Sequence, residues 1–259
     1  MKKPYEAHEL LYRNMRTKGL RCWEELNAKN EHHDGIEVYQ ERFMEDALAM
    51  PWAPKGGVAI ELGCGTGPIL RWLGKRGFRG VGVDISRTAI TMAREQTKIT
   101  GLRFIHGDVC TIGSKMAGSF DLAVDGHCLH CLSLPKDRKA FLRNAFRLLR
   151  PGGLLLISTM CRPIDRKEFL SKHRERLVGG VLFAPAKLAE EYEGSRIIKG
   201  KMHMPTRYIG HWKSITAEVK QAGFRTQLIR LSLHAPGYPI SSLCIGALVP
   251  ATDAGAGLR

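Results

Sequence analysis

A turn rich in glycine is the first stretch whose residue types suggest chemistry. Gly63, Gly65 and Gly67 alternate with other residues directly after an apolar run, and the acid Glu61 stands two residues before the first of them. Glycine lacks a Cβ and adopts positive φ angles, so the backbone turns sharply and a ligand can approach it closely. Pro68 suits the first position of a helix, where free N–H groups face the turn. The pattern predicts a strand, a tight turn and a helix that together bind a nucleotide cofactor.

Further acids follow the turn, each at the end of a predicted strand. Asp84 lies nineteen positions after Gly65, which is where a carboxylate accepts hydrogen bonds from the hydroxyls of a ribose. Asp108 follows the apolar segment 102–106, and Asp125 ends the segment 120–125. The carboxyl ends of parallel strands meet at one edge of a sheet, where ligands bind. We therefore expect these acids to lie around one site.

The run E-x-G-x-G-x-G from Glu61 to Gly67 resembles motif I of the class I S-adenosylmethionine (SAM)-dependent methyltransferases, whereas dinucleotide folds prefer G-x-G-x-x-G. The resemblance extends over about 55–250 and is strongest over 57–160. It implies SAM as cofactor, S-adenosylhomocysteine as product and transfer of a methyl group to a nitrogen, oxygen or sulfur nucleophile. It also implies an α/β fold, a Rossmann-like three-layer α/β/α sandwich whose seven-stranded, mostly parallel sheet has an antiparallel strand 7.

In the family that this sequence resembles, an acid placed like Asp108 binds the adenine amino group, and the next backbone N–H meets the ring. An acid placed like Glu61 favours the positive charges of SAM. The predicted cofactor-binding residues are Glu61, Gly63, Cys64, Gly65, Gly67, Asp84, Ile85, Asp108, Val109 and Asp125.

The segment after Asp125 contains two histidines and two cysteines, and it carries the candidate catalytic residues. A hydroxyl or ammonium nucleophile must lose a proton when it is methylated, and histidine, with a reference pKa of about 6.5, is suited to accept it. His127 is the first candidate for this base because it is nearest the strand end, and His130 is the second.

Two other interpretations of the same segment stay open. The cysteines Cys128 and Cys131, with Cys161 at the end of a later strand, would suit a thiol or metalloid substrate. The histidine and cysteine spacing also suits zinc, but no second pair of ligands is present, so no metal is predicted. Buried packing as small hydrophobic residues is the third interpretation, preferred for Cys64, Cys110, Cys128 and Cys244.

The elements that position these residues form a single methyltransferase domain. The expected parts are an N-terminal helical cap at 1–54, a SAM-binding core at 55–160, a basic lid or insert at 161–208, a closing helix and strands 6 and 7 at 209–250, and a tail at 251–259. In the cap, Tyr12 and Tyr39 are candidate substrate-binding residues. In the insert, which carries a net charge of +5, Arg162 and Arg207 are the candidates.

The composition and net charge indicate which kinds of partner the protein is expected to bind. The 259 residues carry a net charge of +15, which favours an anionic partner. A tetrapeptide N/D-P-P-[YFW] after the fourth strand would resemble the one that amino-methyltransferases acting on nucleic-acid bases use. This sequence has no such tetrapeptide, so a small anionic acceptor is preferred over RNA bound through the basic insert.

No run approaches the ~20 apolar residues of a membrane span, no signal peptide is visible, and the odd number of cysteines suggests reduced thiols. We therefore expect a cytoplasmic enzyme without a membrane partner, and a homodimer stays open.

Overall fold

The computed structural model describes residues 1–26, 32–113, 116–162, 176–186, 189–232 and 240–251. Most of the predicted tail, and the part of the basic insert at 163–175, lie outside the described residues.

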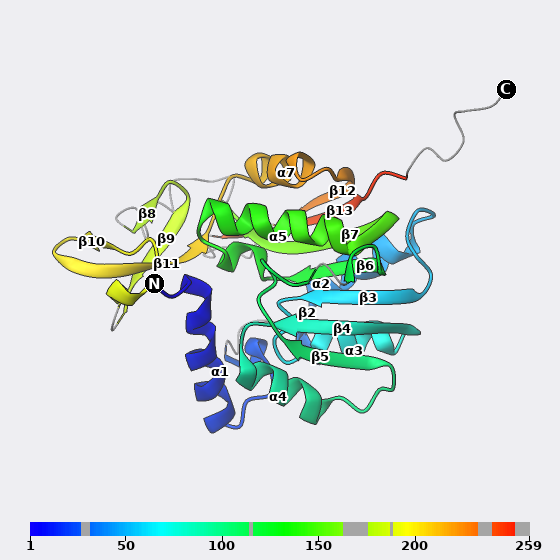
Figure 1. Cartoon of the computed structure of the whole chain (residues 1–259), viewed down its shortest axis with the longest axis horizontal. Helices are drawn as coiled ribbons and strands as arrows, with labels where there is room; N and C mark the ends of the chain where they lie inside the picture. Colours follow the sequence, from blue (N-terminus) through cyan, green and yellow to red (C-terminus); the bar gives the residue numbers. More distant parts are fainter. Residues whose placement is uncertain (27–31, 114–115, 163–175, 187–188, 233–239, 252–259) are drawn as a thin grey trace.

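A seven-stranded sheet forms the centre of the molecule, in the order β12-β13-β7-β6-β3-β4-β5 (Figure 1). Its strands are β3 (Gly57–Leu62), β4 (Phe78–Asp84), β5 (Leu102–His106), β6 (Phe120–Gly126), β7 (Leu149–Cys161), β12 (Arg225–Ser232) and β13 (Ser241–Leu248). Strands β5, β4, β3, β6 and β7 pair in parallel, and β13 is antiparallel to both β7 and β12. This topology confirms the predicted fold, including the antiparallel seventh strand.

Helices cover both faces of the sheet. They are α2 (Val38–Ala49), α3 (Pro68–Gly74), α4 (Arg87–Gln96), α5 (Pro135–Leu148) and α7 (Trp212–Gln221). A further helix, α1 (His8–Thr17), packs against α4. Short 3-10 turns occur at η1 (Pro4–Ala7), η2 (Trp23–Leu26), η4 (Leu129–Cys131) and η5 (Ala189–Glu191).

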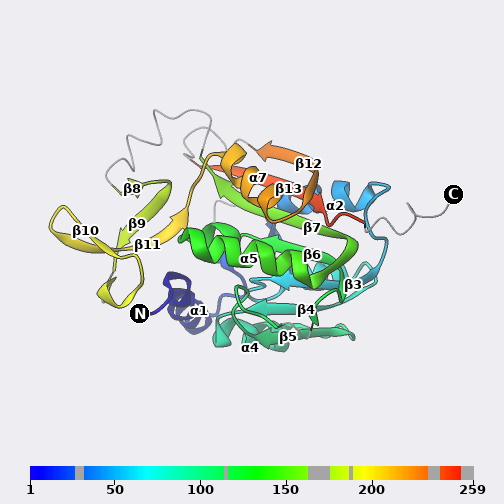
Figure 2. The same cartoon turned by 45° about the horizontal axis from the view of Figure 1, so that its top comes forward.

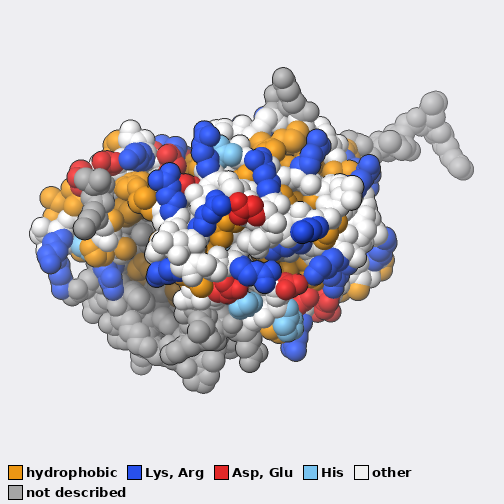
Figure 3. Space-filling view, turned by 90° about the horizontal axis from the view of Figure 1, so that it is seen from below, with side chains coloured by type: hydrophobic (Ala, Val, Ile, Leu, Met, Phe, Trp, Pro, Cys, Tyr) orange, Lys and Arg blue, Asp and Glu red, His pale blue; other side chains and the backbone are white. Residues whose placement is uncertain are grey.

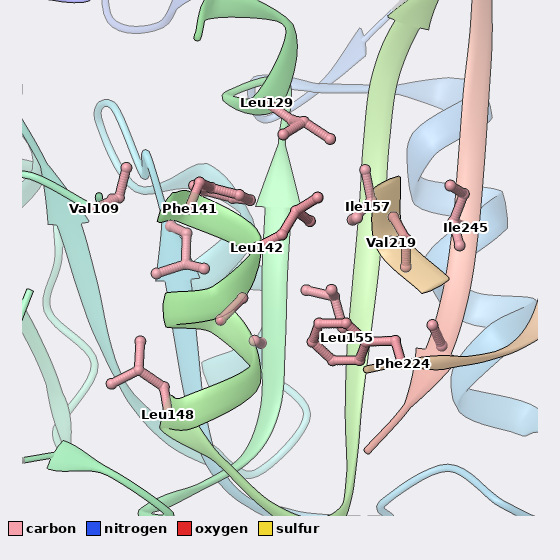
Figure 4. Packing of buried hydrophobic residues seen from close by; sticks show 14 of the residues in the cluster. Val109, Leu129, Phe141, Leu142, Leu148, Leu155, Ile157, Val219, Phe224 and Ile245 are labelled. Carbon is pink, nitrogen blue, oxygen red and sulfur yellow. The ribbon is translucent and has the colours of Figure 1, made fainter. Parts of the chain in front are cut away.

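Two hydrophobic clusters, one on each face, join the helices to the sheet. Phe141 and Leu148 of α5 and Val219 of α7 pack on one face, in the cluster drawn in Figure 4. Phe43 of α2 and Leu70 of α3 are buried in the cluster on the other face. Helical spacing places the apolar side chains of each helix along one stripe, and burial of that stripe holds the strand ends in a fixed arrangement.

A second, four-stranded sheet was not predicted. It consists of β8 (Leu177–Val178), β9 (Val181–Pro185), β10 (Arg196–Ile198) and β11 (Lys201–Tyr208), within the segment expected as an insert. It lies beyond the central sheet, next to the N-terminus (Figures 1 and 2). The backbone N–H of Lys2 donates to the carbonyl of Glu191 at 2.8 Å, which joins the N-terminus to this region. A hairpin of β1 (His32–His33) and β2 (Ile36–Glu37) precedes α2.

The helices of the described residues are too short or too polar for any of them to be a membrane-spanning candidate.

Candidate active site

The glycine turn between β3 and α3 has the conformation that its sequence predicts. Gly63, Gly65 and Gly67 have φ angles of +77°, +51° and +77°. A Cβ on Gly65 would lie 2.4 Å from the hydroxyl oxygen of Tyr12, so a larger residue has no room there. The N–H groups of Gly63 and Cys64 both donate to the carbonyl of Val83, at 2.8 and 2.9 Å. The turn is therefore anchored to the end of β4.

A cavity opens at the carboxyl edge of the sheet, next to this turn, and encloses about 1280 Å³ including the part open to solvent. Twelve of the predicted site residues line it, namely Tyr12, Glu61, Gly63, Cys64, Gly65, Asp84, Ile85, Asp108, Val109, His127, His130 and Arg207. Four others do not line it, namely Tyr39, Gly67, Asp125 and Arg162. The sequence spacing thus identifies most of the residues that meet at this edge.

Asp84 connects the turn to the following helix. One carboxylate oxygen accepts the N–H of Gly65 at 2.8 Å, and the other accepts the N–H of Ser86 at 2.8 Å. Burial raises the pKa of Asp84. The hydroxyl of Ser86 accepts the N–H of Ala89 at 3.0 Å and so caps the N-terminus of α4. Each oxygen of Asp84 keeps acceptor capacity for a ligand, because a carboxylate has about four lone-pair sites.

Asp108 and Glu61 present two further acids to the cavity. Asp108 accepts the Tyr5 hydroxyl at 3.0 Å and the N–H of Cys110 at 2.8 Å. Glu61 accepts the N–H of Leu70 at 2.9 Å, and burial raises its pKa to about 8. Both acids reach the cavity from different strand ends.

Asp125 has a different position. Its carboxylate is fully buried and accepts the N–H groups of Cys128, at 2.6 Å, and Leu129, at 3.2 Å. Burial raises the pKa of Asp125 to about 8. The side chain folds back into the loop after β6 and organises it, and it does not line the cavity.

His127 stands at the start of that loop in an uncommon backbone conformation. Its φ angle is +78°, a region that residues other than glycine rarely occupy and that is frequent at functional sites. Its Nε2 lies 2.5 Å from the Tyr39 hydroxyl and 3.8 Å from a carboxylate oxygen of Glu37. Tyr39 is therefore close to the site through His127, although it does not line the cavity.

His130 is more enclosed than His127. Its Nδ1 accepts the N–H of Met160 at 3.3 Å, and its side chain is buried. The rings of His127 and His130 lie 5.6 Å apart between centroids. Both predicted base candidates thus face the same region.

The three cysteines considered for a thiol or metalloid substrate do not all reach the cavity. Cys128 and Cys131 line the cavity, whereas Cys161 is fully buried in β7 and does not. Among the described residues, no group of three or more histidine, cysteine or acidic side chains has the arrangement of a metal site. Cys64 and Cys244 are buried free thiols, as expected for packing residues. Of the two arginines predicted to bind substrate, Arg207 of β11 lines the cavity and Arg162 does not.

Sequence reasoning missed several lining residues from the N-terminal elements. Gln40 of α2 is 3% exposed, and its side-chain nitrogen has no hydrogen-bond partner within the described part of the chain. It lies on the buried side of α2 with Phe43, Met44 and Ala47. A polar residue in line with the apolar residues of this helix was the sequence signal that could have identified Gln40. His8 of α1 and Glu37 of β2 were also missed, and no local pattern distinguishes them.

Comparison with known proteins agrees with this geometry. Residues 60–157 match the model of a protein family described as "Methyltransferase domain". The ubiquinone biosynthesis O-methyltransferase of Psychrobacter cryohalolentis is 28% identical over 144 residues, covering 54% of this chain and 51% of that protein. The chain thus spans about half the length of the curated relatives it matches.

Two solved structures share the fold over almost the whole chain. One is the 1,6-didemethyltoxoflavin-N1-methyltransferase of Burkholderia thailandensis with S-adenosylhomocysteine bound (TM-score 0.60, 16% identity, 96% of this chain and 92% of that one). The other is the [4+2]-cyclase SpnF (TM-score 0.66, 13% identity, 97% and 98%). Residues 60–157 match a methyltransferase domain, and the chain has the fold of SAM-dependent methyltransferases.

Proposed function

We propose that this chain transfers a methyl group from SAM to an oxygen, nitrogen or sulfur nucleophile of a small anionic molecule and releases S-adenosylhomocysteine. The observation that carries this proposal is the single cavity, where Glu61, Asp84 and Asp108 meet the glycine turn and where Arg207 and His127 also face inward. The name of the Psychrobacter relative, an O-methyltransferase, favours oxygen as the acceptor atom.

The residues at the strand ends fit SAM. Its ribose and adenine amino group donate hydrogen bonds and its methionine part is cationic, while the three acids are acceptors. Asp84 would hold the ribose, Asp108 the adenine, and Glu61 the positive charge. The glycine turn lines the cavity through Gly63 and Gly65, so its backbone is available to a ligand. Bound SAM supplies an electrophilic methyl carbon.

His127 would accept the proton of the acceptor. Burial raises the pKa of Tyr39 well above the ordinary value, so the phenol keeps its proton. In the tautomer that suits a base, Nε2–H of His127 donates to the Tyr39 hydroxyl, 2.5 Å away. Nδ1 of His127 then carries the lone pair. The Glu37 carboxylate, 3.8 Å from Nε2, would stabilise the imidazolium that forms.

Positive and donor groups would hold an anionic acceptor. Arg207 brings a guanidinium from the second sheet, and Gln40 brings an amide from α2. A guanidinium is suited to bind a carboxylate with two hydrogen bonds. Arg207 belongs to the segment 161–208 and lines the cavity, which supports the role of this segment as a lid.

RNA is less well supported as the acceptor. Part of the basic insert, at 163–175, lies outside the described residues. On the face seen in Figure 3, lysine and arginine side chains are spread among acidic and hydrophobic ones and form no continuous stripe. A small molecule in the cavity therefore stays the preferred acceptor.

The proposal is tested by binding and by transfer. Calorimetry should detect S-adenosylhomocysteine binding, and the thermal shift with SAM should exceed that with NAD. Transfer of labelled methyl from SAM is then measured on a panel of small hydroxy acids. The cyclase SpnF shares this fold, so binding alone does not establish transfer. Binding without transfer to any acceptor of the panel, or to RNA, would contradict the proposed activity.

Replacing His127 by asparagine is expected to lower kcat by about 10²- to 10⁴-fold, the usual contribution of a general base. The affinity for S-adenosylhomocysteine should change little, because the ring faces the acceptor. Both quantities are measured on the same preparation by steady-state kinetics and calorimetry. Tyr39→Phe keeps the ring and removes the hydroxyl, so a smaller loss is expected. Normal turnover of His127→Asn would show that another group accepts the proton.

Replacing Gln40 by methionine is expected to stabilise the ligand-free protein by about 1–3 kcal/mol, because a buried donor without a partner is removed. The same change should raise KM for the anionic acceptor and leave kcat nearly unchanged. Urea unfolding and steady-state kinetics measure the two effects. Gln221→Met, on the exposed surface of α7, is the matched control and should change neither. A less stable Gln40→Met protein would mean that the amide is satisfied by a bound water.

A further inference from the structure

A second cavity lies beside the proposed active site and has a basic lining. It encloses about 1000 Å³, including the part open to solvent. Four cationic side chains line it, from α3 and from the segments before η2 and after α4, namely Arg71, Lys75, Arg21 and Lys98. The other charged or titratable side chains of the lining are Glu25, Asp34, His32 and the thiol of Cys22. Positive groups therefore outnumber the acids at this surface.

Both acids of the second cavity already have partners. Asp34 forms an ion pair with Lys75, with 3.1 Å between Oδ2 and Nζ. A carboxylate oxygen of Glu25 accepts the backbone N–H of Arg21 at 2.6 Å. Within the described part of the chain, no carboxylate forms an ion pair with the side chains of Arg21, Arg71 or Lys98. Three cationic groups are thus available to an anionic ligand.

Arg71 is oriented by the protein and keeps donors for a ligand. Its Nη1 donates to the carbonyl of Thr66, in the glycine turn, at 2.5 Å. No other described acceptor is bound by this guanidinium, so Nε and Nη2 remain available. Burial lowers the pKa of Arg71, and the charge of Arg21 acts in the same direction, whereas Glu61 and Asp34 act against it. An anion in the cavity would offset the cost of holding these two charges together.

The position of Arg21 is fixed through its backbone. Its N–H donates to Glu25, and its carbonyl accepts the side-chain amide of Gln96 at 3.0 Å. Gln96 is the last residue of α4, and Lys98 follows two residues later. These contacts hold residue 21 beside the end of α4. Segments that are distant in the sequence therefore bring their positive charges to one cavity.

The second cavity and the proposed active site share one wall. Gly35 lines both cavities. Cys22 faces the second cavity, whereas its neighbour Trp23 faces the proposed active site. A Cβ on Gly35 would lie 2.9 Å from Cβ of Cys22, so the wall is closely packed at this point. Two ligands can therefore be bound at the same time, one on each side of the wall.

We propose that the second cavity binds the phosphate groups of a small molecule, at a site separate from methyl transfer. A phosphate group carries up to about two negative charges and has several acceptor oxygens. It therefore matches two guanidinium groups and an ammonium group better than a singly charged carboxylate does. Arg21 and Arg71 would bind the oxygens with paired hydrogen bonds, and Lys98 would add a point charge. The volume of the cavity admits pyrophosphate or a phosphate ester as well as a single phosphate ion.

The test uses the full chain, with pyrophosphate and inorganic phosphate as probes. Calorimetry at low ionic strength should show saturable binding of both, tighter for pyrophosphate and weaker as salt is added. Acetate at the same concentrations should bind much more weakly. The affinity for pyrophosphate should be unchanged when S-adenosylhomocysteine is present in excess, because the cavities are separate. Absence of pyrophosphate binding at millimolar concentrations would overturn the proposal. Displacement of pyrophosphate by S-adenosylhomocysteine would do the same, because it would place the probe in the other cavity.

Three variants with the same change of charge locate the bound phosphate. Arg21→Gln and Arg71→Gln should each weaken pyrophosphate binding about tenfold or more, the usual effect of losing a charged hydrogen-bond donor. Arg79→Gln, at an exposed position outside both cavities, is the matched control and should bind like wild type. Urea unfolding establishes that each variant is folded, and the exposed Arg21 can be replaced with little risk to the fold. Wild-type affinity in folded Arg21→Gln, or an equal loss in Arg79→Gln, would refute this site. None of these results depends on methyl transfer.

Discussion

Asp84→Asn is expected to weaken the binding of S-adenosylhomocysteine by roughly 30- to 1000-fold, or about 2–4 kcal/mol, the range for lost hydrogen bonds to a buried charged group. Asp84 already accepts the N–H groups of Gly65 and Ser86, and the proposed ribose hydroxyls would use its two remaining acceptor sites. Asparagine has one oxygen and places an NH₂ group against a donor. Asp84→Ala should abolish binding. Calorimetry measures both variants.

The loss could also arise from a disordered turn, so the control must disturb the same region without removing the carboxylate. Ser86→Ala removes the side-chain cap of α4, which accepts the N–H of Ala89, and also the contact with Glu9 at 2.7 Å. It should cost about 1 kcal/mol of stability and leave the affinity within a few-fold of wild type. Unchanged binding by Asp84→Ala would refute the ribose assignment.

Local sequence patterns were sufficient to predict the sheet and most of the residues that line the cavity at the glycine turn and at the strand ends. The glycine turn and the acids Asp84 and Asp108 depend on residue type and on position at strand ends, which alternating strands and helices place at one edge. Asp125 satisfies the same rule but its carboxylate folds back onto Cys128 and Leu129. Position at a strand end therefore predicts the neighbourhood of a side chain and not its direction.

The part of the cavity that the N-terminal elements and β11 line was harder to predict, because its contacts join distant segments. The N-terminal helices were expected, but which side of α2 carries Gln40 into the cavity depends on how that helix packs. His8 lines the cavity from α1, and no local sequence pattern marks it. The second sheet was missed because β8 and β10 are only 2 and 3 residues long, too short for a period to appear. Arg207 lines the cavity because of its position in β11. Nothing in the local sequence distinguishes it from the other arginines of the insert.

Glu61→Gln is expected to stabilise the ligand-free protein at pH 8 and to leave its stability unchanged below pH 4.5. Burial raises the pKa of Glu61 from its ordinary value to about 8. Between these values the unfolded chain has released a proton that the folded chain keeps, so the contribution of Glu61 to stability falls as the pH rises. At pH 8 the penalty is roughly 3–5 kcal/mol, and the amide removes it. Urea unfolding at several pH values measures the difference.

Glu41→Gln is the control with the opposite sign. Hydrogen bonds from His33 and the Trp72 indole outweigh burial and lower the pKa of Glu41. This carboxylate therefore stabilises the folded state above its unfolded pKa, and its amide variant should be less stable at pH 8 than wild type. If Glu61→Gln behaved like Glu41→Gln, the carboxyl of Glu61 would be ionised in the ligand-free protein and the assigned shift would be wrong.

The same proton connects stability to binding. The ammonium group of S-adenosylhomocysteine, placed beside Glu61, favours the ionised carboxyl, so binding releases a proton below pH 8, and the affinity for this ligand should rise with pH by up to about tenfold per unit. Glu61→Gln should bind weakly and without this slope, while being the more stable protein. Calorimetry in buffers of different ionisation enthalpy counts the released proton. A flat affinity in wild type would place the cationic group away from Glu61. A more stable variant that binds poorly would identify this buried acid as retained for ligand binding at the expense of stability.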